Sequence, residues 1–174
     1  MSAERSSTTT VVIMGVSGTG KTTLLRALAE RLGWVAAEGD DFHSAANIEK
    51  METGHALDDE DRWPWLASIA AWIDARERAG QNALVTCSAL RRAYRDLLRR
   101  GHPSVWFVHL VAPRAVLAER MEHRSGHYMP VSLLGSQLDT LEPLGSDEPG
   151  IVLQADQPVA ELADEVMDAI ITVE

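Results

Sequence analysis

The stretch TVVIMGVSGTGKTTLLRALAERL, residues 10–32, decides the fold of this chain. It begins with TVVIM, a short apolar and β-branched run typical of buried strands, and it ends with leucines at helical spacing. Between them, GVSGTGKT matches the pattern of a phosphate-binding loop: glycine, four residues, then glycine, lysine and threonine. A strand, a glycine-rich loop and a helix in this order predict an α/β domain that binds a nucleoside triphosphate.

The loop also indicates which groups hold the phosphates. Glycines allow successive N–H groups to approach phosphate oxygens, and a helix starting near Lys21 adds the positive end of its dipole. Lys21 can reach the β- and γ-phosphates, and the Thr22 hydroxyl can hold Mg²⁺. The predicted nucleotide-binding residues of the loop are Gly15, Ser17, Gly18, Thr19, Gly20, Lys21, Thr22 and Thr23.

The rest of the chain alternates between expected strands and expected helices. The strands are predicted at 10–14, 34–37, 83–87, 104–111 and 150–154. Apolar residues recur at helical spacing after Pro64, Pro113 and Pro158, which predicts a helix after each proline. This alternation predicts a parallel sheet covered by helices on both faces. We expect a flexible tail at residues 1–9 and one domain at 10–174.

Composition excludes several functional classes. The net charge of −10 at pH 7 provides no basic field for nucleic acid or an anionic membrane, so we expect neither as a partner. The single Cys87 excludes an internal disulfide and a cysteine zinc cluster, and it fits a reducing cytoplasm. The polar start MSAERSSTTT does not resemble a signal peptide.

The remaining motifs narrow the class to a small kinase. A guanine-specific GTPase would need Asn-Lys-x-Asp, and a transporter ATPase would need an LSGGQ-like signature; the sequence has neither. With 174 residues the chain is also too short for a motor or helicase core. A small kinase needs a carboxylate near the acceptor hydroxyl, a cation for a charged acceptor and a basic lid over the phosphates.

Candidate carboxylates follow the second expected strand. Glu38, Asp40 and Asp41 lie at its carboxyl end, where ligands bind in open α/β sheets. A carboxylate there can accept a proton from a substrate hydroxyl or hold a water on Mg²⁺. The alternative interpretation is a solvated acidic loop.

Candidate cations lie in two further segments. Arg62, in ALDDEDRWPWL at 56–66, either captures a substrate carboxylate with its planar fork or pairs with the neighbouring acids. Arg91, Arg92 and Arg95 follow the third strand, and we expect at least one of them to serve an anion. Ser88 precedes them and is small, as a strand end beside a substrate must be.

Residues 123–145 are predicted to form a mobile lid, with a fixed surface hairpin as the alternative. The segment carries Arg124, several glycines, and leucines that indicate a short amphipathic helix. His127 has no cysteine or histidine partner at metal-ligand spacing, which argues against a zinc site.

Four blocks of the chain, in this order, resemble the gluconate kinase family, relatives of shikimate kinase. The blocks are GVSGTGKTT (15–23), GDDFHSAANIEKMETGHALDDEDRWPWL (39–66), CSALRRAYRDLLR (87–99) and RSGHYMP with LLGSQLDTLEPL (124–144). The resemblance implies phosphorylation of D-gluconate at its 6-hydroxyl by ATP with Mg²⁺. It also implies a three-layer fold, a five-stranded parallel sheet of order 2-3-1-4-5, and a possible homodimer.

The resemblance further implies roles for individual residues. Asp40 orients or deprotonates the acceptor hydroxyl, and Glu38, which stands where relatives usually carry Asp, holds a water on Mg²⁺. Arg120 and Pro158 lie near adenine, and Arg124 closes onto the transferring phosphoryl group. Lys21, Asp40 and Arg124 are thus the expected catalytic residues. The expected substrate-binding residues are Asp40, His43, Arg62, Ser88, Arg91 or Arg92, and His127.

The resemblance leaves two other classes of function open. One is a kinase of shikimate, another small hydroxy acid or a nucleoside monophosphate. The other is an ATP-binding regulator without catalysis.

Overall fold

The computed structural model describes residues 7–123 and 130–173, and its centre is a five-stranded parallel sheet. The strand order, β2-β3-β1-β4-β5, confirms the predicted sheet. Each predicted strand matches an observed strand to within one residue at both ends. The strands are β1 (Thr10–Met14), β2 (Val35–Glu38), β3 (Ala83–Thr86), β4 (Val105–Val111) and β5 (Gly150–Gln154).

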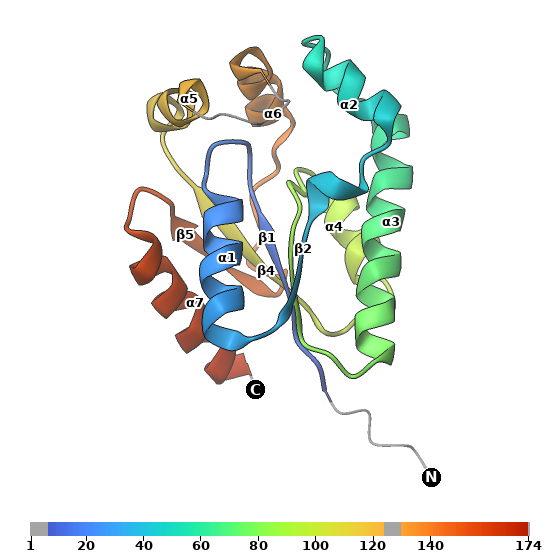
Figure 1. Ribbon diagram of the computed structural model, residues 1–174, viewed down its shortest axis with the longest axis vertical. Coiled ribbons are helices and arrows are strands. Elements are labelled where there is room, and N and C mark those ends of the chain that lie inside the picture. The colour runs from blue at the N-terminus through green and yellow to red at the C-terminus, as the bar shows by residue number, and fades with distance from the viewer. Residues whose placement is uncertain (1–6, 124–129, 174) are drawn as a thin grey trace.

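Helices cover both faces of this sheet, which gives the three-layer architecture that the sequence predicts (Figure 1). Among the described residues, the α-helices are α1 (Lys21–Leu32), α2 (Ala45–Glu52), α3 (Asp59–Arg78), α4 (Arg92–Arg99), α5 (Arg114–Glu122), α6 (Leu134–Thr140) and α7 (Val159–Val173). Two short 3₁₀ turns, η1 (Gly39–Phe42) and η2 (Val131–Leu133), complete the described elements.

The core consists of one apolar cluster on each face of the sheet. Leu28 of α1 and Val166 of α7 are buried in one cluster, and Ile69 of α3 and Leu98 of α4 are buried in the other. Successive residues of β1 alternate between the two clusters, because side chains along a strand point to opposite faces.

Helix α3 begins earlier than the sequence analysis expected. We expected a helix after Pro64, but the helix starts at Asp59 and contains Pro64. Asp58 caps it by accepting from the N–H of Asp61, whose side chain accepts in return from the N–H of Asp58. This capping box and the acidic first turn favour an early start, because they satisfy free N–H groups and oppose the helix dipole. Arg62 therefore lies on the helix.

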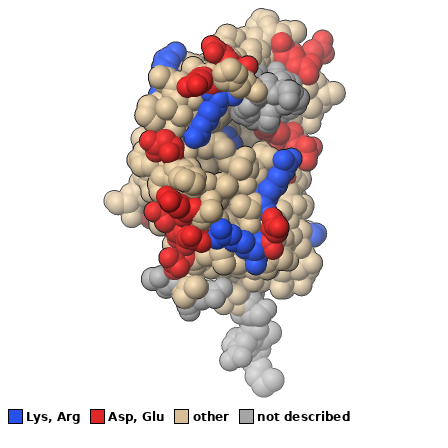
Figure 2. Space-filling view, turned by 60° about the vertical axis from the view of Figure 1, so that its left-hand side comes forward, with Lys and Arg blue, Asp and Glu red and all other residues tan. Residues whose placement is uncertain are grey.

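The surface carries acidic and basic side chains side by side, as Figure 2 shows for one face. There Lys and Arg occur singly or in small groups among Asp and Glu. This distribution agrees with the net charge of −10 and with binding of anions by local groups. Within residues 7–123 and 130–173, no helix is both long enough and apolar enough to cross a membrane.

The carboxyl ends of the strands carry the elements that surround the site. In Figure 1, α2, α5 and α6 lie at the top, at the end of the sheet where the loop after β1 turns into α1. Parallel α/β sheets bind ligands at this edge.

Candidate active site

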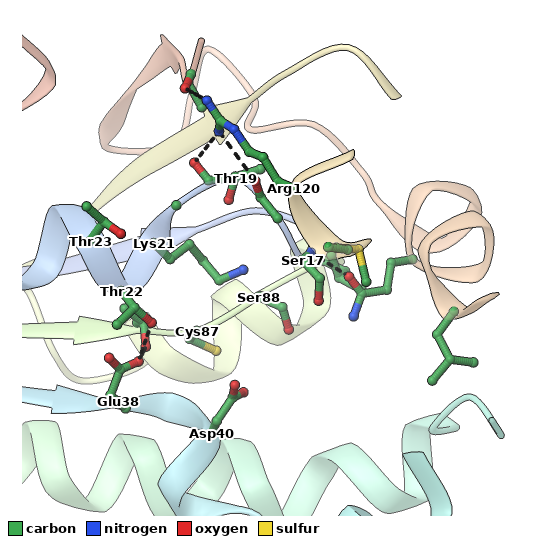
Figure 3. Close-up of a pocket in the computed structure, with 18 of the residues that line it drawn as sticks. Ser17, Thr19, Lys21, Thr22, Thr23, Glu38, Asp40, Cys87, Ser88 and Arg120 are labelled. Carbon is green, nitrogen blue, oxygen red and sulfur yellow. Dashed lines mark hydrogen bonds between the residues drawn. The ribbon is translucent and has the colours of Figure 1, made fainter. Parts of the chain in front are cut away.

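A cavity of about 1140 Å³ opens at the carboxyl ends of the strands (Figure 3). It is lined by the phosphate-binding loop, the η1 turn, the end of β3, and residues of α3, α5 and α6. Pockets for one small ligand usually have volumes of about 300–1,000 Å³. The cavity therefore has room for a nucleotide together with a small acceptor.

The loop at residues 15–20 has the backbone that its glycines predict. Gly15 has a φ of 141°, and a Cβ there would lie 2.6 Å from the carbonyl oxygen of Leu110. Gly20 has a φ of 91° and is the N-cap of α1. Neither position suits another residue, because a side chain would be strained at Gly20 and would also collide at Gly15. The loop is thus held close against β4 and opens directly into a helix N-terminus.

The side chain of Lys21 extends from the start of α1 into the cavity, toward the side on which Asp40 lies (Figure 3). We call that side, which also includes His43 and Arg62, the acceptor side. Its Nζ donates to the carbonyl oxygens of Gly15, at 2.9 Å, and Val16, at 3.0 Å. The amine is therefore fixed above the loop, where the N–H groups that bind phosphate converge. A cation at this point suits the charge of the β- and γ-phosphates.

Thr22 and Glu38 form a pair of oxygen ligands beside Lys21. Oε2 of Glu38 accepts from Oγ1 of Thr22 at 3.0 Å and from Oγ1 of Thr86 at 2.9 Å. Hydroxyl and carboxylate oxygens are the donors that Mg²⁺ prefers, so these residues fit the predicted metal. The sequence analysis did not include Thr86 among the site residues. Its position at the end of β3 was the only signal that could have indicated a role.

The η1 turn fixes Asp40 at the cavity. The N–H of Gly39 donates to Oγ1 of Thr86 at 3.0 Å, and Nε1 of Trp65 donates to the carbonyl oxygen of Gly39 at 2.7 Å. A Cβ at Gly39 would lie 2.0 Å from the carbonyl oxygen of Thr86, so only glycine allows this contact. Asp40 and Asp41 both line the cavity, and Asp40 lies across it from Lys21 (Figure 3). Sequence reasoning missed Trp65, whose apolar pattern indicated only a core position.

His43 lies at the acceptor side as a neutral donor. Its ring stacks on Trp65, with centroids 4.2 Å apart, and its Nδ1 accepts from Nδ2 of Asn47 at 3.4 Å. The proton therefore resides on Nε2. Burial lowers the pKa of His43 to about 4; nearby Asp40 opposes this shift and Arg62 adds to it. The imidazole is uncharged at neutral pH and can donate one hydrogen bond.

Arg62 has a neutral partner rather than an acidic one. Its Nη1 donates to the hydroxyl of Tyr94 at 2.9 Å. The neighbouring acids pair elsewhere: Asp61 and Asp58 with Lys50, and Asp59 with Arg91. No carboxylate of the described chain lies within 4.0 Å of the Arg62 nitrogens. Of the two interpretations of Arg62, this geometry favours binding of an external anion.

The residues after β3 line the cavity and contact the phosphate-binding loop. The carbonyl oxygen of Ser88 accepts from the N–H of Gly15 at 3.2 Å, and Ser88 lines the cavity. Ala89, which follows, has a φ of 45° in the left-handed region. Burial raises the pKa of the neighbouring Cys87 to about 12, so this thiol stays protonated. The small residues at the end of β3 thus lie directly against the phosphate-binding loop.

The three arginines after β3 have different environments. Arg91 pairs with Asp59 at 3.6 Å and lies with Arg62 beside a second, smaller hollow of about 570 Å³. Arg92 pairs with Asp147, and neither Arg91 nor Arg92 lines the main cavity. Of the two candidates for substrate binding, Arg91 is the one that shares a hollow with Arg62.

Arg95 is buried, and its charge is paired inside the protein. It is 0% exposed, and its Nε and Nη2 donate to Glu148 at 2.8 and 3.1 Å. Its Nη1 donates to the carbonyl oxygen of Ala89 at 2.8 Å. The anion that Arg95 serves belongs to the chain, because Glu148 follows the predicted lid and folds back onto α4.

The described part of the predicted lid is attached to the body. Oε1 of Gln137 in α6 accepts from the N–H of Ser17 at 2.7 Å, and the N–H of Glu142 donates to the carbonyl oxygen of Leu90. Leu133 and Leu134 are buried, as the predicted amphipathic helix requires. Arg124 and His127 lie outside the described residues.

Arg120 marks the other end of the cavity. Its Nη2 donates to the carbonyl oxygen of Ala155 at 2.8 Å, and its Nη1 lies 3.4 Å from that of Gly18. Ala155, Gln157 and Val159 line the cavity around Pro158, which directly precedes α7. This arrangement joins the two segments that the sequence analysis assigned to adenine.

Comparisons with known proteins agree with this geometry. A family described as AAA domain matches residues 11–144. A gluconokinase of Gluconobacter oxydans (strain 621H) is 53% identical over 141 residues, which are 81% of this chain and 79% of that protein. The chain belongs to the gluconokinase family. It also shares its fold and 43% identity with a gluconokinase structure from Sinorhizobium meliloti 1021, which has a TM-score of 0.85 and covers 98% of this chain and 95% of the other.

A second solved structure, of a protein described as a sugar kinase, is also similar to this chain. An unliganded sugar kinase from Janibacter sp. HTCC2649 is 54% identical, with a TM-score of 0.88 over 92% of this chain and 93% of that one. The matches span nearly the whole sheet, so the recognition of the family from four sequence blocks is confirmed. A kinase of this family with a phosphate-binding loop uses ATP.

Proposed function

We propose that this chain is a gluconokinase, which transfers the γ-phosphoryl group of ATP to the 6-hydroxyl of D-gluconate. The observation that carries the proposal is Arg62, a guanidinium without a carboxylate partner in the described chain, in the same cavity as Lys21. A hydroxy acid supplies the carboxylate that Arg62 lacks, and its hydroxyls can extend toward Asp40. The names of the relatives specify the acid as gluconate.

The chain's own groups divide the work of phosphoryl transfer. The loop N–H groups and Lys21 hold and neutralise the β- and γ-phosphates, while Asp40 orients the acceptor hydroxyl and accepts its proton. His43 donates a hydrogen bond to the acceptor, and Arg62 binds its carboxylate in the bidentate manner that guanidinium allows. Positioning and charge neutralisation provide most of the acceleration in such transfers.

Thr22 and Glu38 are the residues that would hold Mg²⁺, Thr22 directly and Glu38 through a water. The ion neutralises negative charge on the β- and γ-phosphates when it is bound. Thr86 would orient Glu38, because its hydroxyl donates to the same carboxylate oxygen as Thr22.

The remaining assignments of the sequence analysis stay part of this proposal. Ser88 and Arg91 flank the acceptor, Arg120 and Pro158 lie near adenine, and Arg124 and His127 act from the lid. We also retain a cytoplasmic location and a homodimer, with neither nucleic acid nor membrane as partner.

An acceptor panel tests the function. Purified protein, ATP and Mg²⁺ are supplied with D-gluconate, shikimate, other small hydroxy acids or nucleoside monophosphates, and ADP release is followed in a coupled assay. We expect the highest kcat/KM with D-gluconate. Faster turnover of another acceptor would overturn the substrate assignment, and nucleotide binding without turnover of any acceptor would indicate a regulator.

A further inference from the structure

The guanidinium of Arg62 is oriented by a group that leaves its charge uncancelled. Its Nη1 donates to the hydroxyl oxygen of Tyr94 at 2.9 Å, and its central carbon lies 5.5 Å from the centre of the Tyr94 ring. Both contacts are made with a neutral side chain. A carboxylate in the same place would form an ion pair and would compete with any anion entering the cavity. Tyr94 thus fixes the direction of Arg62 without occupying its charge.

Tyr94 is itself firmly held. It is 1% exposed, its ring meets that of Trp63 edge to face at 5.4 Å, and its hydroxyl donates to Oδ1 of Asp59. Because its only hydroxyl hydrogen goes to Asp59, a lone pair of the oxygen remains to accept from Arg62. Burial and the bond to Asp59 raise the pKa of Tyr94, so the phenol stays neutral at pH 7.

Asp59 is kept away from Arg62 by the same arrangement. Its second oxygen lies 3.6 Å from Nη1 of Arg91, so this carboxylate is placed between Tyr94 and another arginine. The four groups form a chain in the order Arg91, Asp59, Tyr94 and Arg62. The negative charge lies near Arg91, and the free positive charge lies at the cavity that Arg62 lines.

We propose that Tyr94 is a positioning residue for recognition of the acceptor's carboxylate, which it serves by aiming Arg62 into the cavity with its charge available. The inference rests on the proposed function, in which Arg62 binds the carboxylate of the acceptor. Tyr94 acts through Arg62 and determines how tightly a carboxylate-bearing acceptor binds. A core tyrosine without this role would affect only stability.

The variant Tyr94→Phe tests the proposal, because it keeps the ring and its packing and removes one oxygen. KM and kcat are measured for D-gluconate and for ATP, together with the melting temperature. We expect the KM for gluconate to rise about 3- to 12-fold, as for loss of one ordinary hydrogen bond, with the KM for ATP and kcat within twofold. Ser104→Ala is the matched control, because Ser104 also donates its hydroxyl to a carboxylate, that of Glu77, but lies before β4, at the opposite end of the sheet. Its KM values should stay at the wild-type level.

A double-mutant cycle with Arg62→Lys shows whether Tyr94 acts through Arg62. If it does, Tyr94→Phe should raise the KM for gluconate by less than twofold in the Arg62→Lys background. Fully additive effects, an unchanged KM for gluconate in the single variant, or equal rises in both KM values would overturn the proposal. The wild-type rate with gluconate tests the function separately: if another acid is the better acceptor, the same ratios are measured with that acid.

Discussion

The phosphate end of the cavity and its acceptor end are built in different ways. At the phosphate end, one continuous stretch from Gly15 to Thr23 supplies the loop, the lysine and the hydroxyl that we propose for Mg²⁺. At the acceptor end, the η1 turn, α3, the end of β3 and α4 each supply one or two side chains. The first end depends on local backbone geometry. The second depends on hydrogen bonds between segments that are distant in the sequence.

This difference between the two ends predicts which variants lower turnover without affecting folding. Residues of the phosphate end contact the loop and the cavity, so their removal should affect turnover more than folding. Residues that join the distant segments should affect folding as well. Residues at the acceptor surface should change the acceptor's KM alone.

The largest effect on turnover is expected for Lys21→Ala. Removal of one preorganised charge-stabilising donor lowers kcat by about 10²–10³-fold in other enzymes, and we expect a loss of that order here. The Nζ of Lys21 donates to two carbonyl oxygens of the loop, so the melting temperature should change little. Steady-state kinetics and a thermal melt measure both. A variant with near-normal turnover would contradict the phosphate-loop assignment.

The largest effect on folding is expected for Glu148→Gln. The carboxylate is buried and neutralises Arg95, which is also buried, so the variant leaves an uncompensated internal charge. Loss of one partner of a buried pair costs about 3–5 kcal/mol of unfolding free energy; the hydrogen bonds left to glutamine place this variant at about 3 kcal/mol. Urea denaturation measures the change. A difference below 1 kcal/mol would show that α4 and the segment around Glu148 do not depend on this pair.

At the acceptor end, we expect Arg62→Lys to change the KM for gluconate selectively. Lysine keeps the charge but cannot form the bidentate fork, so the KM for gluconate should rise about tenfold or more while the KM for ATP stays nearly constant. Equal increases in both KM values would instead assign Arg62 a structural role. Lys50→Arg serves as a control, since Lys50 pairs with Asp61 nearby and is absent from the cavity lining.

The smallest effect concerns pH and the buried His109 of β4. Burial, aided by the charges of Arg95 and Lys21, lowers the pKa of His109 to about 4 from an ordinary 6.5. Because the folded pKa is the lower one, the stabilising contribution of the neutral ring is complete above pH 6.5 and is lost as the pH falls toward 4. His43 titrates over the same window. His109→Gln should therefore reduce, without abolishing, the fall in melting temperature between pH 6.5 and 4. An unchanged fall would contradict this assignment.

The same contrast explains how much the sequence could predict. The phosphate loop and the strands were predictable because their signals are local: glycine spacing for the loop and short apolar runs for the strands. Glu38, Asp40 and Arg62 were found as chemistry-bearing residues near strand or helix ends. Their partners were not, because the contacts join residues far apart: Arg62 and Tyr94 are separated by 32 positions, and Glu38 and Thr86 by 48.

The arginines after β3 show the limit most clearly. Arg91, Arg92 and Arg95 have the same chemistry and lie within one short segment, so sequence reasoning gave them similar roles. Their environments differ because the chain returns past α4 at residues 142–148. Arg92 pairs there with Asp147, 55 positions away, and Arg95 pairs with Glu148, 53 positions away. No local pattern indicates these pairings.

The position of the new phosphate on the acceptor tests the central claim most directly. With Arg62 holding the carboxylate and Asp40 facing the reacting hydroxyl, the two ends of gluconate are distinguished, and phosphorylation should occur only at the 6-hydroxyl. After reaction of wild-type protein with ATP, Mg²⁺ and D-gluconate, a ¹H–³¹P correlation spectrum of the product should connect phosphorus to the two protons on carbon 6. A phosphate on another hydroxyl or on the carboxylate, or no phosphorylated product, would contradict the account.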